Sequence, residues 1–66
     1  MTQNERVLNH LRERGSITPI EALHVHGVYR LAARVNDLKR RGYDVVSKLK
    51  RDINGHKYAE YRLGGE

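Results

Sequence analysis

The sequence predicts a small α+β fold in which three helices are followed by a two-stranded β-hairpin. Two helix-start signals, at Thr2 and Thr18, and one hairpin-turn signal at 52–55 support this prediction. With 66 residues and no cysteine, the chain is expected to form one domain without disulfides or thiolate metal sites. We expect that domain to span residues 1–63 and a flexible tail to follow at 64–66.

The first helix is predicted over 3–14 and the second, a short one, over about 19–24. Each begins with a capping box, in which a Thr side chain and a Glu three residues later each bond a free backbone N–H. A proline at the first position of the second helix reinforces its start. We expect this helix to bury Ile20 and Leu23, and residues 24–27, which end in a glycine, to form the turn that follows.

The third helix is predicted over 29–41, where Leu31, Val35 and Leu38 form a narrow apolar stripe. At about 100° per residue, polar and small residues fall on the opposite face. They are Tyr29, Arg30, Ala33, Asn36, Asp37 and Arg40. A glycine at 42 ends the helix.

The hairpin register follows from its turn. A two-residue Asn-Gly turn would set Leu49 opposite Glu60. A three-residue loop closed by a glycine bulge instead pairs Asp52 with His56 and sets Lys48 opposite Glu60 as an opposite-charge pair. This second register separates apolar from polar residues, so we prefer it. Its other pairs share one face, which we expect to cover the helices: Leu49 with Ala59, Ser47 with Tyr61, and Val45 with Leu63.

A short extended link at 16–17 is well placed to add a third strand to the hairpin edge. The order of elements is then helix, extended link, helix, turn, helix and hairpin. This is the winged helix-turn-helix arrangement, with the hairpin as the wing.

The positive charge of the chain is concentrated in one stretch. The net charge is +5, yet residues 1–27 are neutral and residues 52–66 carry −1. Residues 28–51 carry eight bases and two acids, a net charge of +6. A basic stripe of this kind is typical of proteins that bind polyanions.

Two strings in the sequence resemble a family of small winged helix-turn-helix domains frequent in phage and prophage proteins. They are Gly-Ser-Ile-Thr-Pro-Ile-Glu-Ala-Leu at 15–23 and Arg-Leu-Ala-Ala-Arg-Val-Asn-Asp-Leu-Lys-Arg-Arg-Gly-Tyr at 30–43. The resemblance covers about residues 4–63 and implies that 29–41 is a recognition helix and 48–57 the wing. Tyr29 departs from the family, which often has Thr or Ser there, and a Tyr cannot cap a helix.

The resemblance and the charge together predict sequence-specific binding of double-stranded DNA, with the third helix in the major groove. The candidates for reading bases are Arg30, Arg34, Tyr29 and Asn36. The candidates for phosphate or wing contacts are Lys39, Arg40, Arg41, Lys48, Lys50, Arg51, His56 and Lys57. We expect Asp37 to orient Arg34 or Arg41 through a local ion pair.

Catalysis, cofactors and metals are not predicted. The chain has no nucleophile-and-base motif, no paired carboxylates and no phosphate-binding loop, so we expect no enzyme. His24 and His26 form a His-x-His pair, and further histidines stand at 10 and 56. We interpret these as polar residues rather than metal ligands.

Several alternatives remain open at the level of sequence. The domain could bind a protein partner, or RNA through its tyrosines. As a DNA-binding protein it could be a phage or prophage transcriptional regulator, or an excisionase-like architectural accessory of recombination. Such a small domain is expected to act as a homodimer or as a cooperative oligomer on DNA. No apolar run approaches the roughly 20 residues of a membrane span, so we expect the cytoplasm of a bacterial cell or phage-infected host, near the nucleoid.

Overall fold

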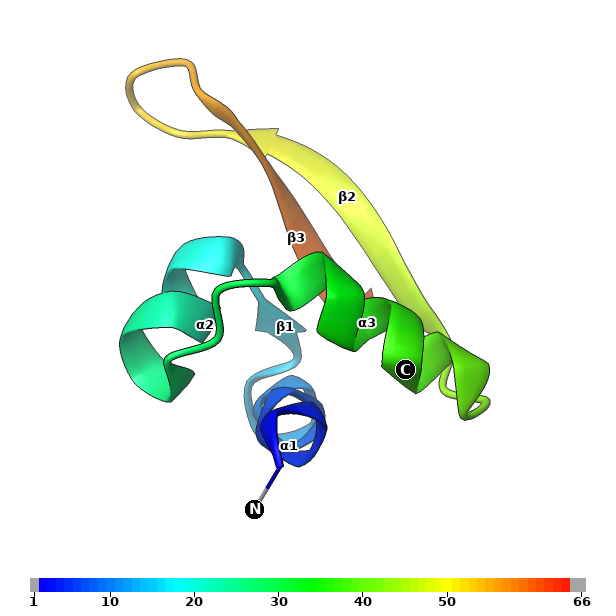
Figure 1. Ribbon diagram of the computed structural model, residues 1–66. Helices are drawn as coiled ribbons and strands as arrows, with labels where there is room; N and C mark the ends of the chain where they lie inside the picture. The colour runs from blue at the N-terminus through cyan, green and yellow to red at the C-terminus, as the bar shows by residue number, and fades with distance from the viewer. Residues whose placement is uncertain (1, 65–66) are drawn as a thin grey trace.

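The computed structural model describes residues 2–64, and it confirms the predicted α+β class (Figure 1). The elements in chain order are α1 (Gln3–Arg14), β1 (Ser16–Ile17), α2 (Pro19–His26), α3 (Leu31–Arg40), β2 (Val45–Arg51) and β3 (Lys57–Leu63). The helices gather at one end of the molecule, and the hairpin of β2 and β3 extends beyond them. We call residues 48–57 the wing and the rest of the described chain the body.

The predicted tail at 64–66 falls largely outside the described residues. Residues 65 and 66 are not described, and neither is Met1. Gly64 is described, and its N–H donates to the carbonyl oxygen of Asp44 over 2.6 Å. The flexibility of the tail therefore stays a prediction.

The start of α1 is the predicted capping box. The Thr2 hydroxyl accepts from the Glu5 N–H over 3.2 Å, and the Glu5 carboxylate accepts from the Thr2 N–H over 3.2 Å. These bonds satisfy backbone donors that have no partner inside the helix. They also lower the pKa of Glu5, because a hydrogen-bonded carboxylate favours its charged form.

A second capping box starts α2, as predicted. The Thr18 hydroxyl accepts from the Glu21 N–H, and the Glu21 carboxylate accepts from the Thr18 N–H over 3.0 Å. The helix runs to His26, two residues past the predicted end, so His24, Val25 and His26 are helical rather than part of a turn. Gly27 follows in the left-handed conformation with φ +67°, which a glycine adopts without strain.

The predicted burial of α2 was wrong. Ile20 is 69% exposed and Leu23 is 38% exposed, whereas Ala22 is fully buried. Ala22 is the buried apolar residue of α2, so the helix packs closely on the body and turns Ile20 outward. Val28, in the loop after α2, fills the core in their place at 1% exposure.

The third helix begins two residues later than predicted, at Leu31. Its predicted apolar stripe is confirmed, because Leu31, Val35 and Leu38 are all buried. Arg30 occupies the N-cap position and makes no side-chain capping bond. Tyr29 thus lies ahead of the helix, where it is 86% exposed.

The sheet has the strand order β1-β3-β2 and is antiparallel throughout. The third strand predicted at 16–17 is present as β1, which pairs with the centre strand β3. The preferred hairpin register is confirmed: the Asp52 N–H donates to the His56 carbonyl over 2.9 Å, and Leu49 stands opposite Ala59.

The hairpin face expected to cover the helices does so only at its base. Val45 is 4% exposed, but Ser47 is exposed and Leu49 is 65% exposed. A seven-residue strand spans roughly 24 Å at about 3.4 Å per residue, which is longer than the small body can cover. The distal hairpin therefore stands free of the core.

The core lies where the helices meet β1 and the base of the hairpin. Its buried members are Val7, Leu8, Leu11, Ile17, Ala22, Val28, Leu31, Val35, Leu38 and Val45. Tyr43, Tyr61 and Leu63 pack against it from the side. This small core holds α3 and the hairpin in fixed relation to each other.

Candidate nucleic-acid interface

The outer side of α3 is polar and cationic. Burial of its apolar stripe leaves Asn36, Lys39 and Arg40 exposed, and Arg41 follows as the exposed C-cap residue. Arg30 is exposed at the opposite end of the helix. The helix thus presents cations at both ends.

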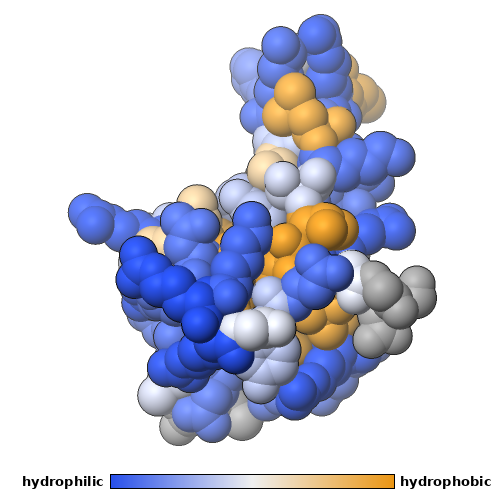
Figure 2. Space-filling view, turned by 90° about the vertical axis from the view of Figure 1, so that its right-hand side faces the viewer, coloured by the Kyte–Doolittle hydropathy of each residue, from blue (hydrophilic) through white to orange (hydrophobic). Residues whose placement is uncertain are grey.

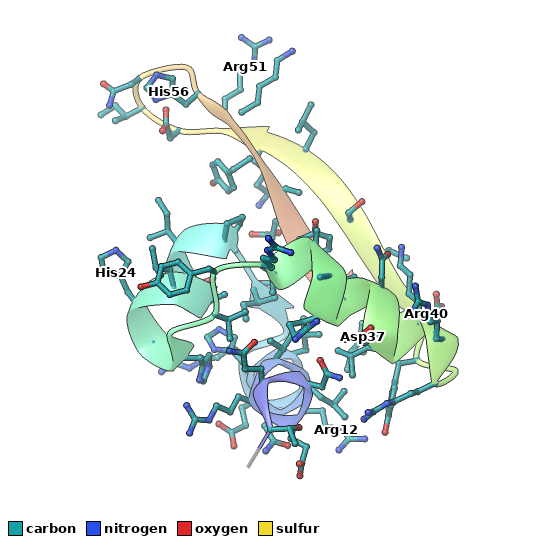
Figure 3. The ribbon with its side chains drawn as sticks, viewed as in Figure 1. Arg12, His24, Asp37, Arg40, Arg51 and His56 are labelled. Carbon is teal, nitrogen blue, oxygen red and sulfur yellow. The ribbon has the colours of Figure 1, made fainter. Side chains whose placement is uncertain are left out.

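Asp37 links two arginines on this helix. Its Oδ2 lies 3.2 Å from Arg34 Nη2, and its Oδ1 lies 3.8 Å from Arg40 Nη1. The predicted pairing with Arg34 is confirmed, but the second partner is Arg40 rather than Arg41. Figure 3 shows Asp37 and Arg40 near the C-terminal end of α3. The Arg40 side chain stays 81% exposed despite the pair, so it remains accessible to an anion.

Arg34 is held against the body. Besides Asp37, its guanidinium donates to the Gln3 side-chain oxygen of α1 over 3.5 Å, and its side chain is 32% exposed. Arg34 therefore lies between α3 and α1 rather than on the open face of the helix. Its role in reading bases stays a prediction, and it requires Arg34 to leave these partners.

The hairpin of β2 and β3 carries cations in two different situations. Lys50 Nζ lies 3.1 Å from the Glu60 carboxylate, and Arg62 Nε lies 3.1 Å from the same oxygen. Lys48 stands opposite Glu60 in the ladder, but the predicted pair between them does not form because Lys50 and Arg62 take that carboxylate. The hydrogen bond from Lys50 and that from Arg62 hold the pKa of Glu60 below its usual value, against the opposing effect of burial.

Three further wing cations have no such partner. Within residues 2–64, Lys48, Arg51 and Lys57 form no ion pair with a carboxylate, and all three are exposed. Figure 3 places Arg51 and His56 at the far end of the wing, whereas Arg12 lies on α1 at the other side of the body. Figure 2 shows the wing as a narrow, mostly hydrophilic arm with apolar side chains between the polar ones.

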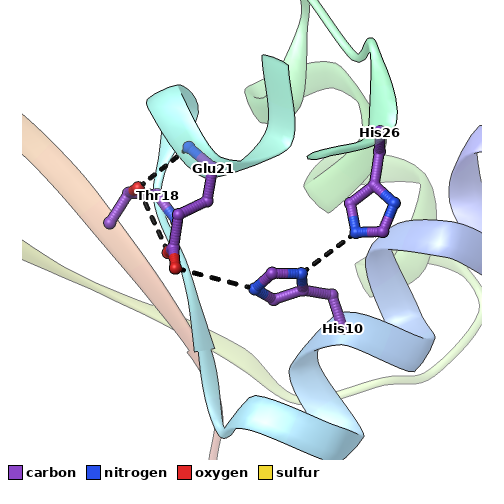
Figure 4. A network of polar contacts seen from close by, with 4 residues as sticks. All are labelled: His10, Thr18, Glu21 and His26. Atoms are coloured by element: carbon purple, nitrogen blue, oxygen red, sulfur yellow. Dashed lines mark hydrogen bonds and ion pairs between the residues drawn. The ribbon is translucent and has the colours of Figure 1, made fainter. Parts of the chain in front are cut away.

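The structure also contains a histidine cluster that the sequence did not reveal (Figure 4). His10 Nδ1 lies 3.0 Å from His26 Nε2, with the ring centroids 5.1 Å apart, and His10 Nε2 lies 3.9 Å from the Glu21 carboxylate. Burial lowers the pKa of His26, and the neighbouring His10 and Arg6 act in the same direction. The cluster joins α1 to α2, on a side of the body that carries none of the predicted DNA contacts.

A clue to this cluster was present in the sequence. His10 follows Val7 by three residues and therefore shares the buried face of α1, where it is 8% exposed. His26 had been interpreted as a turn residue, so its approach to α1 was not predicted. No group of three or more metal-ligating side chains occurs among the described residues.

Comparison with known proteins agrees with this geometry. A family model described as a winged helix-turn-helix domain matches residues 2–66. The chain belongs to the winged helix-turn-helix domain family. In this winged helix-turn-helix domain, α2 and α3 form the helix-turn-helix, and the hairpin of β2 and β3 carries the wing at its far end. Such small domains are typically DNA-binding modules without catalytic activity.

Neither the curated proteins nor the solved structures give a significant match to the chain. None of the helices in residues 2–64 is long and apolar enough to cross a membrane.

Proposed function

We propose that this winged helix-turn-helix domain binds double-stranded DNA with sequence preference, placing α3 in the major groove and the wing along the adjoining backbone. The major groove admits one α-helix, and the N-terminal part of that helix reaches the base edges. Arg30 and Tyr29 project from that end of α3, and Asn36 lies one to two turns further on. Arg34 would also reach the base edges once its guanidinium leaves Asp37.

One observation supports this proposal above the others: the excess positive charge lies on α3 and the wing. Residues 28–51 carry a net charge of +6, whereas the rest of the chain carries −1. On these two elements, the exposed cations that lack a carboxylate partner within residues 2–64 are Arg30, Lys39, Arg41, Lys48, Arg51 and Lys57. Such cations gain most from phosphate, because no internal ion pair has to be broken first.

The contacts divide into two kinds. Arg30, Arg34, Tyr29 and Asn36 would read base edges, where Arg can grip guanine through two hydrogen bonds. The phosphate contacts would come from Lys39, Arg40, Arg41, Lys48, Arg51, His56 and Lys57, with Lys50 contributing less because Glu60 already holds it. Six such contacts would give a slope of roughly −5 in a plot of log K against log salt.

The finer proposal is a transcriptional regulator of phage or prophage type. A single domain of this size buries a modest DNA interface, so useful specificity requires a dimer or cooperative binding at adjacent sites. A regulator would bind one operator that overlaps a promoter. Cooperative binding to an array of repeats beside a recombination site would favour the excisionase-like role instead.

The experiment is selection from a random duplex library, followed by fluorescence anisotropy on the selected duplex between about 50 and 200 mM salt. Arg30→Ala and Arg34→Ala are expected to reduce discrimination between the selected and a scrambled duplex, at a cost of about 1–3 kcal/mol. Arg14→Ala, on α1, is the matched control and should leave both affinity and discrimination nearly unchanged.

Two results would contradict the proposal. One is a protein that binds no duplex at low salt, which would favour a protein partner. The other is an equal loss in Arg14→Ala and Arg30→Ala, which would place the binding surface elsewhere. Circular dichroism of each variant would show that the fold is retained, which matters most for Arg34 because it contacts α1.

A further inference from the structure

The tip of the wing is closed by hydrogen bonds within its own turn. The Gly55 N–H donates to the Asp52 carbonyl over 3.0 Å, and Asp52 Oδ1 accepts from the backbone N–H groups of Asn54 and His56, each over 2.9 Å. Gly55 has φ +81°, which closes the loop as a bulge. These bonds fix the backbone of the tip independently of the core.

Ile53 stands at the apex of this turn and is 100% exposed, the largest value among the exposed apolar residues of the described chain. Its side chain does not pack against the core, and the turn would form equally well with a polar residue at this position. A single exposed apolar side chain is ordinary on a protein surface, but Ile53 stands at the apex of a hydrogen-bonded turn, between the facing cations Arg51 and Lys57. The position therefore suits contact with another molecule.

The charges around Ile53 indicate what that molecule is. Arg51 and Lys57 stand directly opposite each other in the ladder, a like-charge pairing that destabilises the hairpin. Asp52 is the one acid between 51 and 57, and it is occupied by two backbone N–H groups and by His56 Nδ1 at 3.5 Å. The tip thus presents the apolar side chain of Ile53 between Arg51 and Lys57, two cations that have no carboxylate partner within residues 2–64.

The DNA minor groove matches this arrangement. It is about 6 Å wide, too narrow for a two-stranded ribbon but wide enough for one side chain at the end of a turn. Its walls are phosphates, which would relieve the repulsion between Arg51 and Lys57. Apolar side chains that enter this groove insert between base pairs, unstack them partly and bend the duplex towards the major groove.

We propose, on the basis of the DNA binding proposed above, that Ile53 is a wedge that enters the minor groove, partly opens one base step and bends the duplex. Arg51 and Lys57 bind the phosphates on the two sides of that step. Because pyrimidine–purine steps unstack at the lowest cost, the wing adds a preference for such a step at a position that α3 does not touch. This makes the wing a determinant of DNA shape as well as a source of affinity.

The test uses the full chain and the selected duplex, in two labelled forms. In one, 2-aminopurine replaces adenine at successive steps on the side of the site that the wing contacts, and its fluorescence reports unstacking. In the other, a donor and an acceptor at the two ends report bending. The variant is Ile53→Ser, with Ile53→Leu as the conservative form and Val25→Ser as a control that removes an exposed apolar residue from α2.

The wild type is expected to raise the fluorescence at one step and to bend the duplex by roughly 20–90°. Ile53→Ser should lose both signals, yet its affinity should fall by less than about tenfold, because the lost wedge contacts are offset by the unstacking that no longer occurs. Ile53→Leu should recover most of the bend, and Val25→Ser should behave as the wild type.

The outcomes separate the wedge from the DNA binding on which it rests. A wild type that binds the duplex without unstacking or bending it would overturn the wedge and leave the proposed function standing. An Ile53→Ser variant that bends the duplex fully would also overturn the wedge. A wild type that binds no duplex at low salt would overturn both.

Discussion

The body and the wing of this domain are stabilised in different ways. The body has a core in which Leu11, Ile17 and Leu38 are at most 1% exposed. The wing has no core of its own: Leu49 is 65% exposed and Ile53 fully exposed, and its order comes from ladder and turn hydrogen bonds. Substitutions in the body should therefore change mainly the free energy of unfolding, and substitutions in the wing mainly the affinity for DNA.

The largest effect is expected in the core. Leu11→Ala should lower the free energy of unfolding by about 2–5 kcal/mol, because it removes buried apolar atoms and leaves a cavity. At about 0.05–0.15 kcal/mol per residue, a 66-residue domain has a total of roughly 3–10 kcal/mol, so this variant should lose a large share of its stability. Urea denaturation followed by circular dichroism measures the change in the free energy of unfolding.

Leu49→Ala is the matched control for that measurement. It removes the same atoms from an exposed site in the wing and should change the free energy of unfolding by less than about 0.5 kcal/mol. If the two variants lost stability equally, the distinction between body and wing would fail.

The next effect concerns the unpaired wing cations. Arg51→Gln should lower the magnitude of the salt slope of duplex binding by about 1, because one phosphate contact is lost. The midpoint of thermal unfolding should rise slightly, since the repulsion between Arg51 and Lys57 is removed. Anisotropy titrations at several salt concentrations and a thermal melt provide the two values.

Lys50→Gln offers the contrast within the same strand. Lys50 is already paired with Glu60, so its loss should change the salt slope less than the loss of Arg51 does. It should also raise the pKa of Glu60 towards the usual value, because the hydrogen bond that lowers it most is gone. An equal change in slope for both variants would mean that internal pairing does not decide which cations bind phosphate.

The smallest effect is a dependence of the body on pH. The pKa of His26 lies below its ordinary value of 6.5, so the unfolded chain binds more protons than the folded one in the window below that value. Stability should therefore fall as the pH drops through this window and be level above it. His26→Gln should lose less stability than the wild type between about pH 7.5 and about pH 5.5.

Urea midpoints at the two pH values, measured for both proteins, give this difference. An identical loss on acidification in wild type and variant would show that burial of His26 beside His10 does not contribute. Duplex binding by the two proteins at neutral pH should be the same, because the cluster lies between α1 and α2.

Local signals explain how much of this fold could be predicted. The capping boxes at Thr2 and Thr18 depend on residues three apart, and the hairpin register depends on the turn at 52–55, so neighbouring residues suffice to predict them. The orientation of α2 could not be predicted in this way. Whether Ile20 or Val28 enters the core depends on how α2 packs on α1, which no local pattern encodes.

The candidate interface was predictable to a similar degree. Charge along the chain places the cationic region on α3 and the wing, and the binding of DNA there stays a prediction. The ion-pair and hydrogen-bond partners of individual side chains could not be predicted from the sequence, because they depend on contacts between residues that are distant along the chain. Arg34 bonds Gln3 of α1, and Glu60 pairs with Lys50 rather than with the facing Lys48.

The most direct test of the account is to map the DNA-binding surface residue by residue. Amide spectra of the ¹⁵N-labelled domain, recorded while the selected duplex is added at low salt, report which backbone groups change environment. If α3 and the wing bind the duplex, the shifts should be concentrated in residues 29–41 and 48–57. The amide signals on the solvent side of α1, around Glu13, should not change. Shifts centred on the cluster of His10 and His26, or an unchanged spectrum, would contradict DNA binding through α3 and the wing.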